Sequence, residues 1–275
     1  QYDLHLLGLD AFREHLVLLC VGINYFEKIS EAYAETRRKE LINSLDRRIH
    51  DSLKKYSTMQ FLTYLGYSGQ INVLVKLSSM SELEHHGSLL QQAATEIIKT
   101  AHDELQLSVN IGISNLFNNL SGLKQAYNQA QEAYKCKMFV GCGQAICYSA
   151  RLDLESENYE PIRVNLKELQ NQVYLLDQVQ LRYFLEELFT KLEQNWDYEE
   201  VNLVGLELVL ALNNIYADIN KDNEAVLQKK KDYYEQIKHL ETVNDLRSWF
   251  QEAFAQLIVE LDRIYHDDHN IIDKA

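Results

Sequence analysis

The sequence predicts an α+β fold, in which a ferredoxin-like βαββαβ domain is followed by an all-helical module. The first half alternates short apolar runs with longer helical patterns in the order strand, helix, strand, strand, helix, strand. This order is that of the split βαβ arrangement, and one further helix and strand follow it here. Beyond residue 163 the pattern is helical throughout and contains one glycine, Gly205.

The expected strands come from short apolar or alternating runs. Leu16 to Ile23 is a continuous apolar run, as in a buried strand. Residues 59–64 and 71–77 form a second and a third strand, joined by the glycine-bearing segment 66–69, which has the length of a hairpin loop. Residues 109–114 and 145–148 complete the expected sheet.

The expected helices come from apolar residues that recur every three or four positions. In the first half they span 30–56, 79–104 and 122–139, and Ser81 and Glu84 have capping-box spacing. In the second half, five helices are expected around 166–176, 181–192, 203–219, 224–238 and 246–265. Thr242 and Asp245 have the spacing of an N-terminal cap for the last one.

These patterns suggest four segments. Residues 1–13 are expected to be the remnant of a connector helix, and residues 14–150 the α+β domain. Residues 151–163 are polar and contain the single proline, Pro161, so we expect a linker there. Residues 164–275 form the helical module.

Charge and cysteine usage exclude several classes of function. The chain carries 41 acidic and 27 basic residues, a net charge of −14, which repels nucleic acid and anionic membranes. We therefore expect it to bind neither nucleic acid nor anionic membranes.

The four cysteines, Cys20, Cys136, Cys142 and Cys147, show neither a CxxC pair nor zinc-ligand spacing. Reduced cysteines of this kind predict a cytoplasmic protein.

The end of the first strand and the hairpin resemble those of the GGDEF domain of diguanylate cyclases. In that family the first strand ends in a metal-binding Asp, a hydrophobic residue and a second Asp, with a Phe shortly afterwards. The segment Gly22-Ile23-Asn24-Tyr25-Phe26 fits this frame, with Gly22 and Asn24 at the acidic positions. The hairpin reads Gly66-Tyr67-Ser68-Gly69 where the family has its glycine-glycine-acidic signature.

The replaced residues bear directly on catalysis. Phosphodiester formation from a nucleoside triphosphate needs divalent cations, which are held by carboxylate oxygens. Gly22 and Asn24 do not supply these oxygens, so we expect no catalysis, no bound metal and no cofactor. The amides of Gly66 to Gly69 could still approach a phosphate. Simple closure of a hairpin is favoured, because the turn contains no Lys or Arg.

A second resemblance covers nearly the whole chain. Degenerate GGDEF-like domains followed by helices, with a final helix that begins Thr-x-x-Asp/Glu-Leu-x-x-Trp, are typical of the middle region of AraC-type transcriptional regulators. Some of these are response regulators that begin with a receiver domain. Here the motif is Thr242 to Trp249, and residues 270–275 look like the entry to the DNA-binding domain. The resemblance implies a homodimer, with a receiver or sensor domain upstream and a helix-turn-helix domain downstream.

The last helix carries an apolar stripe with two interpretations. Its residues recur every three or four positions and suit either a packed core or a seam between two subunits: Leu246, Phe250, Phe254, Leu257, Leu261 and Ile264. Core packing is favoured, because coiled coils need more heptads, and the interface stays open as an alternative.

The leading hypothesis is a non-catalytic signalling and dimerisation module of a bacterial AraC-type regulator in a two-component system. It would relay an upstream signal to the downstream helix-turn-helix domain. The alternative is a sensor that binds a small molecule or nucleotide in a cleft between the two modules. An active diguanylate cyclase remains only if the alignment of Asn24 is wrong.

Overall fold

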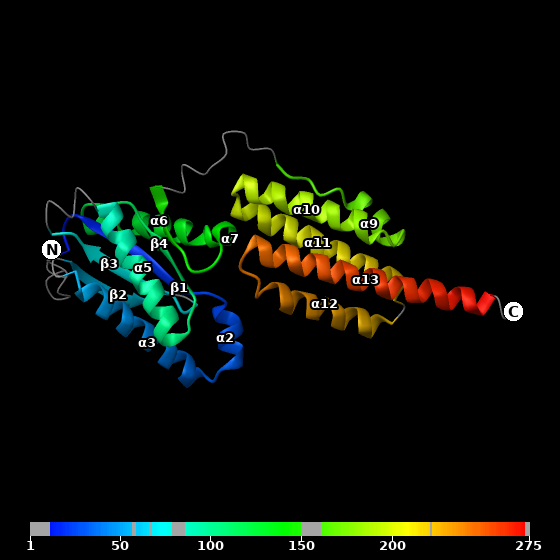
Figure 1. Ribbon diagram of the computed structural model, residues 1–275, viewed down its shortest axis with the longest axis horizontal. Coiled ribbons are helices and arrows are strands. Elements are labelled where there is room, and N and C mark those ends of the chain that lie inside the picture. The colour runs from blue at the N-terminus through cyan, green and yellow to red at the C-terminus, as the bar shows by residue number, and fades with distance from the viewer. Residues whose placement is uncertain are drawn as a thin grey trace. The chain divides into compact units, whose positions relative to one another are not determined.

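The computed structural model describes residues 12–56, 59–66, 68–78, 86–149, 161–220 and 222–272 (Figure 1). The chain divides into two compact units, residues 1–155 and 156–275, and each is described by itself. Within the described ranges, no helix is both long enough and apolar enough to cross a membrane.

The first unit is built on a five-stranded sheet with the strand order β2-β3-β1-β4-β5. Strand β1 pairs antiparallel with both β3 and β4, β2 pairs antiparallel with β3, and β5 pairs parallel with β4. This is the ferredoxin-like sheet with one added strand, so the predicted fold class is confirmed. The strands span Leu16–Ile23 (β1), Gln60–Leu65 (β2), Ile71–Lys76 (β3), Val109–Ile113 (β4) and Ala145–Cys147 (β5).

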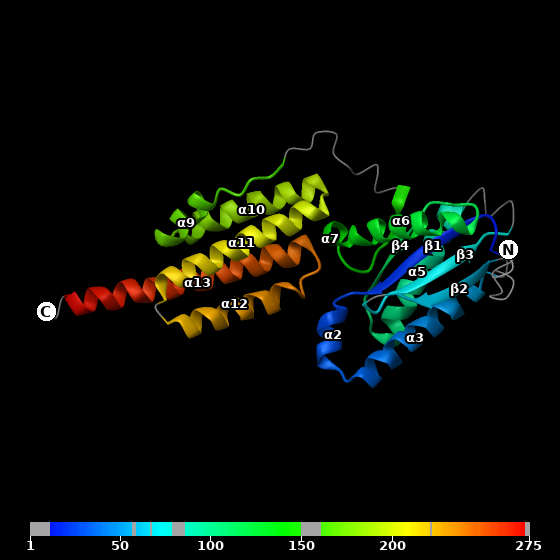
Figure 2. The ribbon, with the colours of Figure 1, turned by 180° about the vertical axis from the view of Figure 1, so that it is seen from behind.

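Strand β1 is buried along its whole length because helices cover both faces of the sheet (Figures 1 and 2). Val17, Leu19 and Val21 belong to a core shared with helices α3 (Glu35–Lys54) and α5 (His86–Leu105). The alternate residues, among them Leu18 and Cys20, pack with helix α6 (Leu123–Lys135). Burial on both faces explains why the strand reads as a continuous apolar run.

Two predicted helices are each divided in two. The expected helix 30–56 consists of α2 (Phe26–Ala32) and α3, because Tyr33 adopts an extended backbone between them. The expected helix 122–139 consists of α6 and the short α7 (Lys137–Val140), after the 3-10 turn η2 (Leu120–Gly122). The break at Cys136 lets both Cys136 and Met138 turn into the core. Helical periodicity did not reveal either break.

The second unit consists of helices within the described residues, as predicted. They are α9 (Leu166–Tyr174), α10 (Gln178–Asn195), α11 (Tyr198–Ile219), α12 (Asn223–Ile237) and α13 (Val243–Ile272). Asp197 and Asp222 cap α11 and α12 by accepting hydrogen bonds from the first backbone amides. Helix α13 extends past the ends of its neighbours (Figure 2).

The predicted cap of the last helix is confirmed. Thr242 Oγ1 accepts from the Asp245 amide at 3.0 Å, and Asp245 Oδ2 accepts from the Thr242 amide at 3.1 Å. This reciprocal pair is a capping box, which fixes the start of α13. The predicted Ser81–Glu84 box, the segment 1–11 and most of the predicted linker, 151–160, lie outside the described residues.

Candidate functional site

The C-terminal end of β1 is closed by the phenol ring of Tyr134 on α6. A β-carbon added at Gly22 would lie 2.4 Å from Tyr134 Oη and 2.5 Å from its Cζ. Real side chains do not tolerate such contacts, so the ring occupies the space in which a side chain at position 22 would begin. Lys137 Nζ donates to Tyr134 Oη at 2.9 Å and lies 4.6 Å from the ring centroid. An aromatic ring and an ammonium group therefore stand beside Gly22.

Asn24 is buried and acts as a hydrogen-bond donor. Its Nδ2 donates to Ser108 Oγ at 2.9 Å and to Asn110 Oδ1 at 2.7 Å. Asn110 in turn holds the loop between α7 and β5, since its Nδ2 donates to Gly141 O at 3.0 Å and its Oδ1 accepts from Gly143 N at 2.9 Å. The network joins the end of β1 to β4 and to this loop. Asn24 thus performs a structural task in this arrangement.

The hairpin between β2 and β3 meets the turn that follows β1. Gly66 N donates to Gln70 O at 2.8 Å, which closes the loop. Gly69 has φ +72°, a left-handed conformation that favours glycine, and a β-carbon there would lie 2.6 Å from the ring of Phe26. Ser68 is also left-handed, with φ 51°. The structure therefore places the hairpin in contact with the turn that follows β1. In the sequence, these two segments were linked only through their resemblance to the GGDEF domain.

A second group of polar side chains lies under the hairpin, on the face of the sheet covered by α6. Gln131 Nε2 donates to Gln70 Oε1 at 2.8 Å and lies 3.2 Å from Cys20 Sγ. Burial raises the pKa of the Cys20 thiol to about 12. Asn72 is fully buried in the adjacent strand, and its amide forms no hydrogen bond within the described part of the chain. Cys20 is therefore buried in the core beside Gln131, and its raised pKa favours the protonated thiol over the reactive thiolate.

Comparison with known proteins identifies the unit that holds this site. Residues 2–136 match the family model described as GGDEF-like domain. The first unit is a GGDEF-like domain. A relative among curated proteins is the uncharacterized HTH-type transcriptional regulator YtdP of Bacillus subtilis (strain 168), which is 25% identical over 197 residues. The match covers 67% of this chain and 24% of YtdP, so the chain spans about a quarter of the length of this relative.

Solved structures similar to the chain include GGDEF-type domains. The active GGEEF domain of a diguanylate cyclase from Vibrio cholerae has a TM-score of 0.40 and 11% identity, over 52% of this chain and 88% of that one. An EAL/GGDEF domain protein from M. capsulatus has a TM-score of 0.40 and 18% identity, over 54% and 97% respectively.

Sequence reasoning found part of the site in the GGDEF-like domain. It singled out Gly22, Asn24, Gly66, Ser68 and Gly69, which the structure places around the end of β1 and the hairpin; Tyr67 lies outside the described residues. It missed the side chains that surround them, namely Tyr134, Lys137, Asn110, Gln70 and Gln131. The spacing of two of these residues could have indicated that they lie near the site: Gln131 and Tyr134 are three positions apart, on the helix face that also carries Ala130. Asn110 could also have been recognised from the sequence, because it is a polar residue within an otherwise apolar strand.

The motif at the start of α13 anchors this helix to two neighbours. Trp249 Nε1 donates to Gln236 Oε1 of α12 at 2.9 Å, and its ring meets that of Tyr233 edge to face at 5.7 Å. Arg247 Nη2 lies 2.6 Å from Glu193 Oε1 of α10. The motif residues therefore fix the position of α13 within the helical unit.

The apolar stripe of α13 packs inside this unit along most of its length. Leu246, Phe250, Phe254, Leu257 and Leu261 are buried, and the Phe250 ring stacks on Phe189 of α10 at 6.0 Å. This corrects the subunit-seam interpretation for these five residues, because they are covered by their own chain. Ile264 is 36% exposed.

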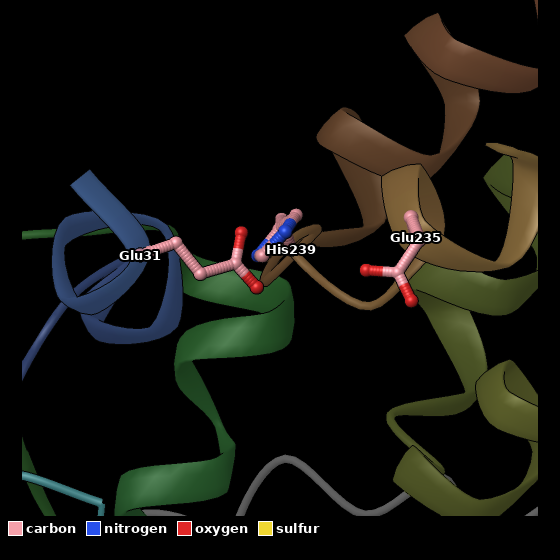
Figure 3. Close-up of side chains that lie close together, drawn as sticks. All are labelled: Glu31, Glu235 and His239. Carbon is pink, nitrogen blue, oxygen red and sulfur yellow. The ribbon is translucent and has the colours of Figure 1, made fainter.

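Figure 3 draws Glu31 of α2 together with Glu235 and His239, which lie at the end of α12 and just after it. Glu31 belongs to the first unit and the other two residues to the second. A metal site needs ligands that are held in fixed geometry. Because these three residues come from two separate units, we do not assign a metal site to them.

Proposed function

We propose that this chain is a non-catalytic signalling module of a bacterial AraC-type transcriptional regulator, a response regulator that acts in the cytoplasm as a homodimer. The GGDEF-like domain and the helical unit would relay an event in an upstream receiver or sensor domain to a downstream helix-turn-helix domain. The observation that carries the proposal is the phenol of Tyr134, which fills the space beside Gly22.

The donor set at this site does not fit a divalent cation. Magnesium requires hard oxygen ligands, mostly carboxylates, and near-octahedral geometry. The hydrogen bonds described above join amides, hydroxyls, a phenol and the Lys137 ammonium, and neither Gly22 nor Asn24 brings a carboxylate to the end of β1. An ammonium beside the site also repels a second cation. We infer that the domain keeps the GGDEF-like fold as a scaffold without the metal-dependent chemistry.

The helical unit supports a relay. Signal transmission requires an element that responds as one body to a change elsewhere. Helix α13 is such an element, because its capping box fixes its start and the contacts of Arg247 and Trp249 tie it to α10 and α12. Similarity to a protein described as an HTH-type regulator agrees with this role.

A direct assay tests the absence of catalysis. The purified chain, incubated with GTP and either Mg²⁺ or Mn²⁺, should yield no cyclic dinucleotide by chromatography and mass spectrometry. An active diguanylate cyclase processed in parallel is the positive control. Measurable product from this chain, abolished by EDTA, would overturn the proposal.

The relay is tested in the full-length natural protein. Arg247→Gln removes the ion pair with Glu193 and should leave DNA binding intact while reducing the transcriptional response to the upstream signal. Arg263→Gln, at an exposed position of the same helix, is the matched control. An unchanged response in Arg247→Gln, or an equal loss in both variants, would contradict a relay through α13.

A small-molecule sensor is the second candidate, and one observation favours it. A half-open groove of about 490 Å³ lies in the helical unit between the segment that begins at Pro161 and helix α10. Phe184 and Leu188 give it an apolar wall. Its charged lining residues are Arg163, Glu168 and the ion pair Lys191–Glu187, so Arg163 is the basic group outside that pair. A saturable thermal stabilisation by one compound from a panel of nucleotides and sugars, lost in Arg163→Gln, would favour this function. Stabilisation that persists in Arg163→Gln would place the ligand elsewhere.

A further inference from the structure

Helix α11 presents an apolar stripe that the described residues of the helical unit leave exposed. Leu203, Leu206 and Leu210 are 63%, 62% and 60% exposed, although they lie on a helix whose other side is buried. Their spacing of three and four residues places them on one helix face. Glu207 lies on the same face and is also exposed. We call these four residues the acidic stripe.

Helix α12 presents a second stripe with the opposite charge. Leu227 and Tyr234 are 56% and 65% exposed, and Lys230 and Lys231 are exposed between them. Positions 227, 230, 231 and 234 share one helix face. We call these four residues the basic stripe. Glu207, Lys230 and Lys231 form no ion pair within the described part of the chain, so their charges are available.

Both stripes face away from the core of the helical unit. On α11, the opposite face carries Val204, Leu208 and Ile215, which are buried. On α12, the inward residue is Tyr233, whose ring packs against Trp249 of α13. The two helices pack against each other and are joined by the short segment 220–222. They therefore form a helical hairpin with an outer surface that is apolar, acidic on one helix and basic on the other.

We propose that this surface is a homodimer interface, in which the acidic stripe of one chain packs on the basic stripe of a second copy and the reverse contact forms by symmetry. A two-fold axis between two such hairpins makes both contacts at once, which is the isologous arrangement that most homodimers use. The leucines meet Leu227 and Tyr234, and Glu207 meets Lys230 and Lys231. Pairing of like stripes would instead oppose equal charges, which is unfavourable.

This interface differs from the seam suggested by the sequence, because most of that α13 stripe is buried within the chain. It does not depend on the proposed relay. Sedimentation of the full chain tests the interface, whereas the cyclase and transcription assays test the function. The interface rests on the homodimer of the proposed function, so a monomeric chain would contradict both, whereas the absence of catalysis and the relay can each fail while the interface holds.

A charge-exchange experiment gives the sharpest test. Two variants of the full chain are prepared, Glu207→Lys and the double variant Lys230→Glu, Lys231→Glu, and their dimerisation is measured by analytical ultracentrifugation. Each variant alone should dissociate about tenfold more readily than the wild type, because both of its symmetric contacts now oppose like charges. An equimolar mixture should recover dimers, since both contacts in the mixed dimer again pair opposite charges.

Leucine substitution supplies a second measurement with a matched control. Leu206→Glu should weaken the dimer about a hundredfold, since it places a charge at the centre of the apolar contact. The double variant Val179→Ser, Tyr183→Ser removes equally exposed apolar residues from α10, and it should dimerise like the wild type. Circular dichroism verifies that each variant is folded. A monomeric wild type, a mixture that does not recover dimers, or equal effects of Leu206→Glu and the α10 control would each overturn the proposal.

Discussion

The hydrogen-bond network of Asn24 makes the substitution Asn24→Asp a demanding test of this structure. The two side chains have nearly the same shape, so the change replaces a donor by an acceptor without altering packing. Asn24 Nδ2 donates at 2.9 Å to Ser108 Oγ and at 2.7 Å to Asn110 Oδ1. The Ser108 hydroxyl can turn its hydrogen toward a carboxylate and retain its contact.

Asn110 has no such freedom. Its amide is oriented by Gly141 O, which accepts from Nδ2, and by Gly143 N, which donates to Oδ1. A carboxylate at position 24 therefore faces an acceptor that does not turn away. One hydrogen bond to a buried group is lost and a buried charge is gained, so we expect a loss of about 2 to 4 kcal/mol in the free energy of unfolding.

The deficit should depend on pH in a defined direction. Burial raises the folded-state pKa of the introduced carboxyl above its unfolded value of about 3.9. Below the unfolded value the protonated group can donate to Asn110, so the variant is then closest to the wild type. Stability is lost as the pH rises through the folded-state pKa.

Urea denaturation followed by circular dichroism, at acidic and neutral pH, measures this effect. Asn118→Asp is the matched control, because Asn118 is exposed and uses its Oδ1 only to accept from His15 N at 3.1 Å, a bond that Asp keeps. A neutral-pH loss below about 0.5 kcal/mol, or a loss that does not shrink in acid, would refute the reasoning.

Three further substitutions or modifications are predicted from the same structure. Gly22→Ala should cost about 1 to 3 kcal/mol of stability, because the added methyl overlaps the phenol of Tyr134. The cost should shrink in a Tyr134→Ala background, and equal costs in both backgrounds would contradict the overlap. Thr242→Ala should cost about 1 kcal/mol in thermal unfolding, since it removes the acceptor of the Asp245 amide, whereas Thr242→Ser should be nearly neutral. Iodoacetamide should label the partly exposed Cys142 in the native protein and leave Cys20 unmodified, because Cys20 is buried and its pKa is raised to about 12; early labelling of Cys20, detected by mass spectrometry, would argue against this burial.

The sequence predicted the sheet and the helical second unit because periodicity is a local signal. The apolar run of β1 and the capping pair Thr242–Asp245 are both read from a few adjacent residues, and both are present in the structure. The division at Tyr33 was not predictable in this way. Tyr33 breaks no helical pattern, and periodicity alone does not reveal that its backbone is extended.

The candidate site was only partly predictable for a related reason. Resemblance located Gly22 and Asn24, but their surroundings come from residues about a hundred positions away, such as Tyr134 and Asn110. A single sequence does not say which distant side chain fills a given space. It also did not distinguish exposed from buried leucines: the α13 stripe is mostly core, whereas Leu206 of α11 is exposed.

Helix α13 is continuous from Val243 to Ile272 and contains neither glycine nor proline. At about 1.5 Å per residue it acts as a rod about 45 Å long. The first half of α13 is held in place by aromatic packing around Phe250, and its C-terminal end extends beyond the other helices (Figure 2). In a straight helix of this length, a tilt of the packed half displaces the far end by a larger distance. A rotation of the packed half about the helix axis rotates the far end by the same angle. Under the proposed relay, small repacking around Phe250 would move the far end of α13 without any change in the helix itself.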